Sequence, residues 1–238
     1  GVQTCALPIC DHAGALIGSA FDRSGQQLFQ LPANAAHASA SASAPLVETL
    51  WGGFVAIVAE HDAVVVQREP SGTMPCYHAQ IGSAHLFASD VALLTASSLF
   101  PVSINWRFVA HHLLWPERRT TETGLDRIDE LMPGERCRVT STGCHRDLFW
   151  SPWAFAATSE QIEAPEKMVD TVRRATQNSV SAWSRRYPRP LVSLSGGLDS
   201  SILTACLPAT AAVAVTFLTG EALGDERRYA GAVAARYG

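Results

Sequence analysis

Residues 191–201 read Leu-Val-Ser-Leu-Ser-Gly-Gly-Leu-Asp-Ser-Ser, an apolar run that passes through two glycines into a helix-forming segment. Residues 190–194 have the length of a short buried strand, and residues 198–207 have the periodicity of a helix. Glycines adopt positive φ and lack a Cβ, so backbone N–H groups can close on an anion in front of the partly positive helix N-terminus. The stretch therefore predicts a phosphate-binding turn between a strand and a helix.

Two hydroxyls and a carboxylate in this turn add to the site. Ser195 and Ser200 can donate further hydrogen bonds, whereas Asp199 would repel a bare phosphate unless a Mg²⁺ ion bridged the two. The turn contains no lysine, so it is not the GxxxxGK[ST] loop. An ordinary strand-to-helix turn, with Asp199 as a first-turn carboxylate, is the alternative. We favour the phosphate site because the motif stands between a strand and a helix, as it requires.

The segments after the turn predict a parallel sheet. Residues 211–217 indicate a second strand, and residues 225–237 indicate a second helix. Strand, helix, strand and helix at this spacing are typical of a parallel sheet with helices on its faces. Asp225 and Glu226 begin the second helix, where helix-end carboxylates and a metal role are both open interpretations.

The first part of the chain has the short apolar runs, separated by turn residues, of a packed sheet. The predicted elements are strands around the turn 22–25, within 51–67, at 86–88 and around 141–143, and helices at 90–99 and 106–115. The Ala/Ser stretch 33–44 has no periodic apolar face and indicates a surface loop. The polar segment 158–166 indicates a domain boundary, and the helix predicted after it carries Met168 and Val172 on its apolar side.

Composition and charge narrow the class of protein. The chain has 238 residues, of which 47% are hydrophobic, and its net charge of -4 is spread in both signs. It lacks the dense Lys/Arg clusters of nucleic-acid-binding surfaces, so we expect no nucleic acid partner. It also lacks an apolar run of about 18 to 20 residues that would span a bilayer. We expect a cytoplasmic protein without a transmembrane segment.

The cysteines and histidines form no motif along the chain. The six cysteines are Cys5, Cys10, Cys76, Cys137, Cys144 and Cys206. They include no CxxC pair and no His/Cys set at zinc spacing, which predicts free thiols in a reducing compartment. The neighbours His111 and His112 point in different directions on the predicted helix, so we expect no shared metal. Cys144-His145 is expected near a hairpin turn and receives no role.

The glycine turn matches the SGGxDS pyrophosphate loop and resembles that superfamily of adenine nucleotide α-hydrolases. The resemblance implies attack on the α-phosphate of ATP, an acyl adenylate and release of pyrophosphate. It implies catalytic roles for Asp199 and Ser195, and Mg²⁺ at Asp199. It also implies contacts with ATP or pyrophosphate at Leu194, Ser195, Gly196, Gly197, Asp199, Ser200, Thr216 and Thr219.

Earlier segments resemble the glutaminase-like domain of asparagine synthetases. Residues 68–77, Arg-Glu-Pro-Ser-Gly-Thr-Met-Pro-Cys-Tyr, look like its RDPxGxxPLY segment. Residues 87–90 look like its FASE segment, and Trp51-Gly52-Gly53-Phe54-Val55-Ala56, Thr123-Gly124-Leu125, Leu131-Met132-Pro133-Gly134 and Trp150-Ser151-Pro152-Trp153 stand in the expected order. The resemblance implies an α/β protein: an α+β, Ntn-hydrolase-like sheet domain over residues 11–157, then a truncated parallel-sheet pyrophosphate-loop domain over 158–238. Residues 1–10 are interpreted as a sequencing artefact, because residues 1–9 look like a translated sequencing adapter.

Within that family, the segments 51–56 and 70–77 are most similar to the macrolactam-forming cyclases of lasso peptide biosynthesis. That resemblance implies adenylation of a side-chain carboxylate in a precursor peptide, followed by attack of the peptide's own α-amine, with a protease as a further partner. The N-terminal Cys nucleophile and the NGEIYN segment of glutamine-dependent members are not recognisable, so we expect a glutaminase-like domain without glutaminase activity. The alternatives are an asparagine synthase that uses glutamine or ammonia to amidate a small-molecule carboxylate, and a non-catalytic scaffold that binds a peptide.

Overall fold

The computed structural model describes residues 14–29, 44–156, 164–187, 189–208, 212–218 and 225–237. The chain divides into two compact units. Unit 1 comprises Gly1–Arg23 and Leu28–Glu160, and unit 2 comprises Ser24–Gln27 and Gln161–Gly238. The artefact interpreted at residues 1–10 and, apart from Ala44, the loop predicted over 33–44 lie outside the described residues.

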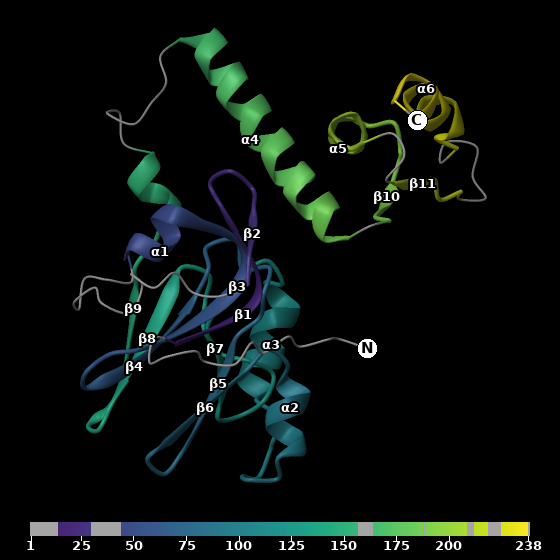
Figure 1. Ribbon diagram of the computed structural model, residues 1–238. Helices are drawn as coiled ribbons and strands as arrows, with labels where there is room; N and C mark the ends of the chain where they lie inside the picture. The colour runs from purple at the N-terminus through teal and green to yellow at the C-terminus, as the bar shows by residue number, and fades with distance from the viewer. Residues whose placement is uncertain are drawn as a thin grey trace. The chain divides into compact units, whose positions relative to one another are not determined.

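A six-stranded sheet with the order β2-β1-β3-β4-β8-β9 carries the first part of the chain (Figure 1). Its strands are β1 (Gly14–Asp22), β2 (Gln27–Leu28), β3 (Leu50–Ala59), β4 (Ala63–Arg68), β8 (Glu135–Thr140) and β9 (Gly143–Leu148). The central strand β3 is antiparallel to both β1 and β4. Its sequence is almost continuously apolar, as expected of a strand with side chains buried on both faces. The strands predicted around the turn 22–25 and around 141–143 are confirmed.

A second sheet, with the order β6-β5-β7, and short helices complete unit 1. These elements are β5 (Tyr77–Ile81), β6 (Ala84–Ala88), β7 (Ile128–Glu130), α1 (Ala44–Thr49), α2 (Val91–Ala96), α3 (Trp106–Leu114) and the 3-10 helix η2 (Pro152–Phe155). Asp90 caps α2 by accepting from Ala92 N at 2.8 Å, and Asn105 caps α3 by accepting from Phe108 N at 3.0 Å. Such side-chain caps satisfy first-turn N–H groups and set where a helix begins. Both predicted helices are confirmed.

Alternate residues of β3 supply two separate cores. Phe54, Ala56 and Val58 belong to one buried cluster, whereas Val55 belongs to another that includes Cys137. This division follows from the period of two in a strand, which sends successive side chains to opposite faces. Burial of one side chain such as that of Phe54, 1% exposed, contributes about 1.5 to 3 kcal/mol. The apolar run of β3 therefore holds layers together on both sides of the sheet.

The guanidinium of Arg68, at the end of β4, is buried and donates four hydrogen bonds. Its side chain is 1% exposed and forms an ion pair with Glu130 at 2.6 Å. It also donates to the carbonyl oxygens of Met74 at 2.8 Å, Leu131 at 2.7 Å and Gly72 at 2.8 Å. A guanidinium has five N–H donors in a rigid fork, so one side chain can hold several carbonyls in fixed positions. Arg68 therefore ties the loop after β4 to the end of β7.

Replacement of Arg68 by Met should strongly destabilise unit 1. The substitution leaves Glu130 and the three carbonyl groups without their buried donor, and loss of one partner of a buried pair costs about 3 to 5 kcal/mol. The measurement is chemical denaturation of the full chain, followed by circular dichroism. Arg107→Met is the matched control, because Arg107 is 80% exposed and its ion pair with Glu122 lies at the surface. A surface pair contributes about 0 to 1 kcal/mol, so equal effects of the two variants would contradict the prediction.

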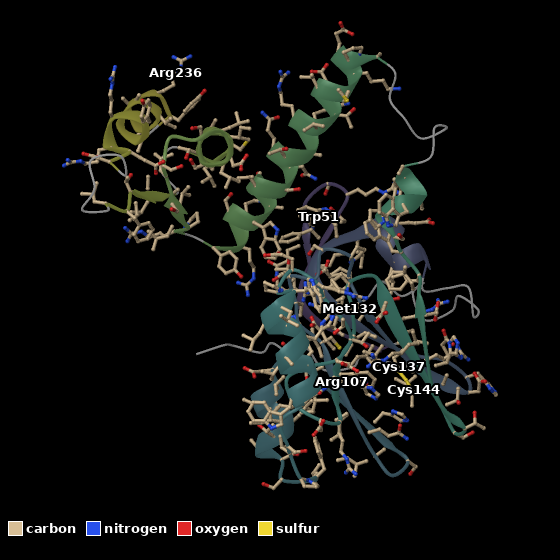
Figure 2. All side chains as sticks on the ribbon, turned by 180° about the vertical axis from the view of Figure 1, so that it is seen from behind. Trp51, Arg107, Met132, Cys137, Cys144 and Arg236 are labelled. Carbon is tan, nitrogen blue, oxygen red and sulfur yellow. A yellow bond between two sulfur atoms is a disulfide. The ribbon has the colours of Figure 1, made fainter. Side chains whose placement is uncertain are left out.

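A disulfide joins Cys137 on β8 to Cys144 on β9 (Figure 2). The expectation of free thiols is therefore wrong for this pair. The hairpin register sets Cys144 diagonally to Cys137, with a Cα–Cα distance of 6.2 Å, which lies in the usual range for disulfides. Cys76 and Cys206 are free, as predicted, whereas Cys5 and Cys10 lie outside the described residues. The spacing of cysteines along the chain did not reveal the pair because strand pairing brings it together.

Unit 2 contains three helices and a pair of strands among its described residues (Figure 1). They are α4 (Pro165–Arg186), β10 (Leu191–Ser193), α5 (Leu198–Cys206), β11 (Val213–Val215) and α6 (Arg227–Tyr237). Strands β10 and β11 are parallel, with Leu191 opposite Val213. Met168 and Val172 of α4 line a hollow together with Ile202 of α5, which fits their predicted place on an apolar side. The predicted α/β class is confirmed.

The described helices can be compared with the length and apolar character that a membrane-spanning helix requires. Within the residues that the structure describes, none of them combines sufficient length with sufficient apolar character to cross a bilayer. The longest, α4, spans Pro165–Arg186 and carries charged residues along its length. It packs against α5.

Candidate functional site

The predicted phosphate turn lies where β10 passes into α5. Leu194 is 2% exposed, and its N–H donates to the Val215 carbonyl at 2.9 Å, which extends the parallel pairing past β10. Gly196 has a φ of 81°, whereas Gly197 is extended and precedes the first residue of α5. The side chain of Leu194 therefore belongs to the core, and only its backbone is placed to take part in a site.

The two serines of the turn are bonded to each other and to the turn backbone. The hydroxyl oxygens of Ser195 and Ser200 lie 3.1 Å apart. Gly197 N donates to Ser195 Oγ at 3.2 Å, and Ser195 N donates to Ser200 Oγ at 3.3 Å. These contacts bring the predicted residues Ser195, Gly197 and Ser200 together. The hydroxyls hold the shape of the turn, so its backbone is organised before any ligand binds.

The N-terminus of α5 suits an anion. Gly197 supplies no side-chain cap, and Ser201 N makes an early helical hydrogen bond, to the Gly197 carbonyl at 3.1 Å. The N–H groups of residues 198–200 come before that bond and belong to the set that a helix leaves without internal partners. Together with the helix dipole they favour a phosphate at this end. Asp199 lies in the same turn with an exposed side chain, where its carboxylate can share a cation with a phosphate.

Thr216 joins the site from the neighbouring strand. It follows β11 directly, and its Oγ1 donates to the Leu194 carbonyl at 2.8 Å. The ends of β10 and β11 are thereby tied together where ligands of parallel sheets bind. Phe217 follows with 73% of its side chain exposed. Thr219, the remaining predicted residue, lies outside the described residues.

Helix α6 packs directly on the turn at Gly196. A Cβ on Gly196 would lie 2.4 Å from Tyr229 Cβ and 2.7 Å from Ala230 N. A glycine is therefore required both by the positive φ and by the approach of α6. Tyr229, with 62% of its side chain exposed, is thus a neighbour of the turn that sequence reasoning missed. No motif marks it, since only the packing of α6 brings it to the turn.

The two glycines of the turn should tolerate alanine very differently. Gly196→Ala meets Tyr229 and needs a strained φ, whereas a Cβ on Gly197 would come no closer than 3.3 Å, to Ser195 Oγ. Overpacking of this kind costs about 1 to 3 kcal/mol, so Gly196→Ala should lower the melting temperature by several degrees and Gly197→Ala by much less. Thermal unfolding of the full chain measures both. Equal decreases in melting temperature for the two variants would show that α6 does not pack against Gly196.

The contacts of Asp225 distinguish between a helix-end carboxylate and a metal ligand. Arg227 donates from Nε to Asp225 Oδ1 at 2.9 Å and from Nη2 to Oδ2 at 2.6 Å. The hydrogen bond from the Arg227 side chain lowers the pKa of Asp225 to about 2. Asp225 also accepts from Arg227 N at 3.1 Å at the start of α6, so it acts as a helix-end carboxylate. Both its oxygens are occupied, which does not favour a metal role.

The family-like segments of unit 1 converge on Arg68. The loop 69–76 supplies the carbonyl groups of Gly72 and Met74, and the segment 131–134 supplies the carbonyl of Leu131 and the Gly134 N–H, which donates to the Arg68 carbonyl at 3.2 Å. Residues from these two segments therefore share one structural centre. The thiol of Cys76 lies beside it, and burial raises the pKa of that thiol to about 12. Cys76 is therefore a packed side chain and not a nucleophile.

Comparisons with known proteins gave a family match within unit 2 and a structural match over a larger part of the chain. The family model described as asparagine synthase matches residues 171–238, which include the whole turn and all of α6. No curated protein sequence matches the chain. Among solved structures, the glutamine phosphoribosylpyrophosphate amidotransferase from B. subtilis, complexed with ADP and GMP, matches with 14% identity and a TM-score of 0.32. The match covers 63% of this chain and 32% of that chain, so this chain spans about a third of its length. A likeness at this TM-score carries no functional argument.

Proposed function

We propose that the chain is an ATP-dependent amide ligase that activates a carboxylate as an acyl adenylate and releases pyrophosphate. The observation that carries the proposal is the turn 195–200, which opens α5 beside the ends of two parallel strands. The same residues fall within the asparagine synthase match. A phosphate at this place would meet backbone N–H groups, the helix dipole and the ends of the strands together.

The residues of the turn suit the pyrophosphate half of ATP. The N–H groups of the first turn of α5 bind the β- and γ-phosphates, and Ser195 and Ser200 keep the turn in shape. A carboxylate beside a phosphate can share a Mg²⁺ ion with it. The exposed carboxylate of Asp199 would have this role when ATP is bound. The ion would neutralise phosphate charge when bound there. Phe217 is exposed just after β11, and an exposed aromatic ring at this position would suit stacking on the adenine.

The reaction has two steps. An oxygen of the substrate carboxylate attacks the α-phosphorus of ATP, the bond from that phosphorus to the bridging oxygen breaks, and pyrophosphate leaves. An amine nitrogen then attacks the acyl carbon, AMP leaves and the amine loses one proton. Fixed donors around the departing pyrophosphate lower the barrier of the first step, because they are already oriented where charge accumulates.

The carboxylate is proposed to be a side chain of a precursor peptide, whose own α-amine then attacks. Two features support this choice over a small amino acid. The segments 51–56 and 70–77 resemble lasso peptide cyclases, and unit 1 has an apolar hollow of about 360 Å³, lined in part by Met74, Phe87 and Leu94. An apolar hollow of this size suits side chains of a peptide.

Asp199→Asn should weaken binding of ATP with Mg²⁺ and slow pyrophosphate release. Loss of the carboxylate removes a cation ligand next to the phosphates, and loss of one such charge-stabilising group costs about 100- to 1,000-fold in rate. Calorimetry measures ATP binding, and an ATP–pyrophosphate exchange assay measures the reaction. Asp170→Asn is the matched control, because Asp170 is exposed on α4 and its ion pair among the described residues is with Arg173. Unchanged ATP binding and exchange in Asp199→Asn would support a non-catalytic scaffold instead.

Two probes distinguish the candidate substrates in that exchange assay. A peptide with a free α-amine and an internal Asp or Glu should support exchange and yield a product smaller by one water. L-Aspartate with ammonia or glutamine should not. Exchange with L-aspartate alone would replace the peptide proposal by asparagine synthase and leave carboxylate activation intact.

A further inference from the structure

Two hairpins of unit 1 carry metal-ligating side chains at the same spacing. His78 and His85 lie on β5 and β6, and Cys137 and Cys144 lie on β8 and β9. In both hairpins the second residue lies two positions from the cross-strand partner of the first. Residues at such diagonal positions point to the same face of a hairpin. Each hairpin therefore presents its two ligating side chains on one face.

The two faces meet in the interior of unit 1. The ligating atoms of His78, His85 and Cys144 all lie within 4.8 Å of one another. His78 Nε2 is 2.9 Å from His85 Nδ1, and Cys144 is bonded to Cys137. Ligand atoms around a tetrahedral zinc ion lie about 3.3 to 3.8 Å apart, given the usual Zn–N and Zn–S bond lengths. Small side-chain movements would therefore bring these atoms to zinc distances.

The surroundings hold the imidazoles in place. The His78 side chain is buried, and its ring stacks on Phe87 with a centroid distance of 4.7 Å. Phe87 and Cys144 pack against the apolar cluster that contains Cys137. Arg146 Nη2 lies 3.1 Å from His78 Nδ1, so that nitrogen accepts a hydrogen bond and the proton is on Nε2. The cluster is thus a packed set of donors with one cation, Arg146, beside it.

We propose that His78, His85, Cys137 and Cys144 form a zinc site. The site cannot bind zinc while Cys137 and Cys144 form a disulfide, and it binds zinc once the disulfide is reduced. A thiol reductant supplies two electrons, the S–S bond breaks, and the reductant becomes a disulfide. Each cysteine then loses its proton to bind zinc as a thiolate. The His78 proton moves from Nε2 to Nδ1, and Arg146 gives up its contact there. The two thiolate charges offset the charge of the zinc ion beside Arg146.

All residues of this site belong to unit 1, whereas the turn proposed to bind ATP belongs to unit 2. The site links the redox state of the chain to metal binding. Oxidation of the two thiolates reforms the disulfide, removes both sulfur ligands and releases zinc. The proposal also accounts for the shared spacing in the two hairpins, since the two diagonal pairs bring the ligating atoms of His78, His85 and Cys144 together and leave Cys137 bonded to Cys144.

Cobalt(II) tests the site, because tetrahedral thiolate coordination gives it intense visible bands and a sulfur charge-transfer band. The full chain, with Cys5→Ser and Cys10→Ser to remove the thiols outside the described residues, is titrated with Co²⁺ before and after reduction by a phosphine. The expected result is one Co²⁺ per reduced chain with these bands, displacement by Zn²⁺, and no bands in the oxidised chain. The proposal would be overturned if the reduced chain gave no cobalt–thiolate bands, or if the reduced and oxidised chains gave bands of equal intensity.

Variants locate the metal. His85→Gln keeps the disulfide cysteines, and Cys144→Ser removes a sulfur ligand; each should weaken Co²⁺ binding by more than about 100-fold. His145→Ala and Cys206→Ser are the controls and should bind as the parent does, since His145 is exposed and Cys206 lies in unit 2. If Cys144→Ser fails to fold by circular dichroism, His85→Gln decides. Full binding by folded His85→Gln would refute the site.

Discussion

The buried guanidinium of Arg68 is the interaction on which unit 1 depends. It lies at the end of β4 and donates to carbonyl groups of the following loop and of the segment after β7, while Glu130 balances its charge. A charge buried in this way is stable only when every donor has a partner. The position of Arg68 therefore requires the loop 69–76 and the end of β7 to adopt one arrangement. This requirement gives a physical reason for the turn residues, such as Gly72 and Gly134, in the surrounding segments.

Unit 2 is organised by a different constraint, which is the absence of a side chain. Gly196 lets the chain turn sharply between β10 and α5 while α6 packs against the turn. The same turn leaves the N-terminus of α5 without a side-chain cap. A tight turn and an uncapped helix end are what a phosphate requires. The proposed carboxylate activation thus rests on the backbone of the turn more than on any one side chain.

The pair of hairpins with two histidines and two cysteines suggests that unit 1 has a chemistry of its own. Sequence spacing indicated no zinc set, yet the packing of hairpins from two different sheets brings His78 and His85 close to Cys144, more than fifty residues further along the chain. A disulfide and a zinc ion compete for the same sulfur atoms. The redox state of Cys137 and Cys144 would then decide whether unit 1 holds a covalent bond or a metal.

The sequence by itself determined the local structure. The strand, glycine turn and helix of residues 191–206, the capped helices at 91–96 and 106–114, and the hairpin around 141–143 follow from periodicity and from the properties of glycine, Asp90 and Asn105. Only the tertiary structure decided which distant residues meet. The engagement of Thr216 with Leu194, the approach of Tyr229 to Gly196 and the Cys137–Cys144 disulfide arise from strand pairing and helix packing. Local rules act over a few residues, whereas these contacts depend on register and packing across the fold, which no local pattern encodes.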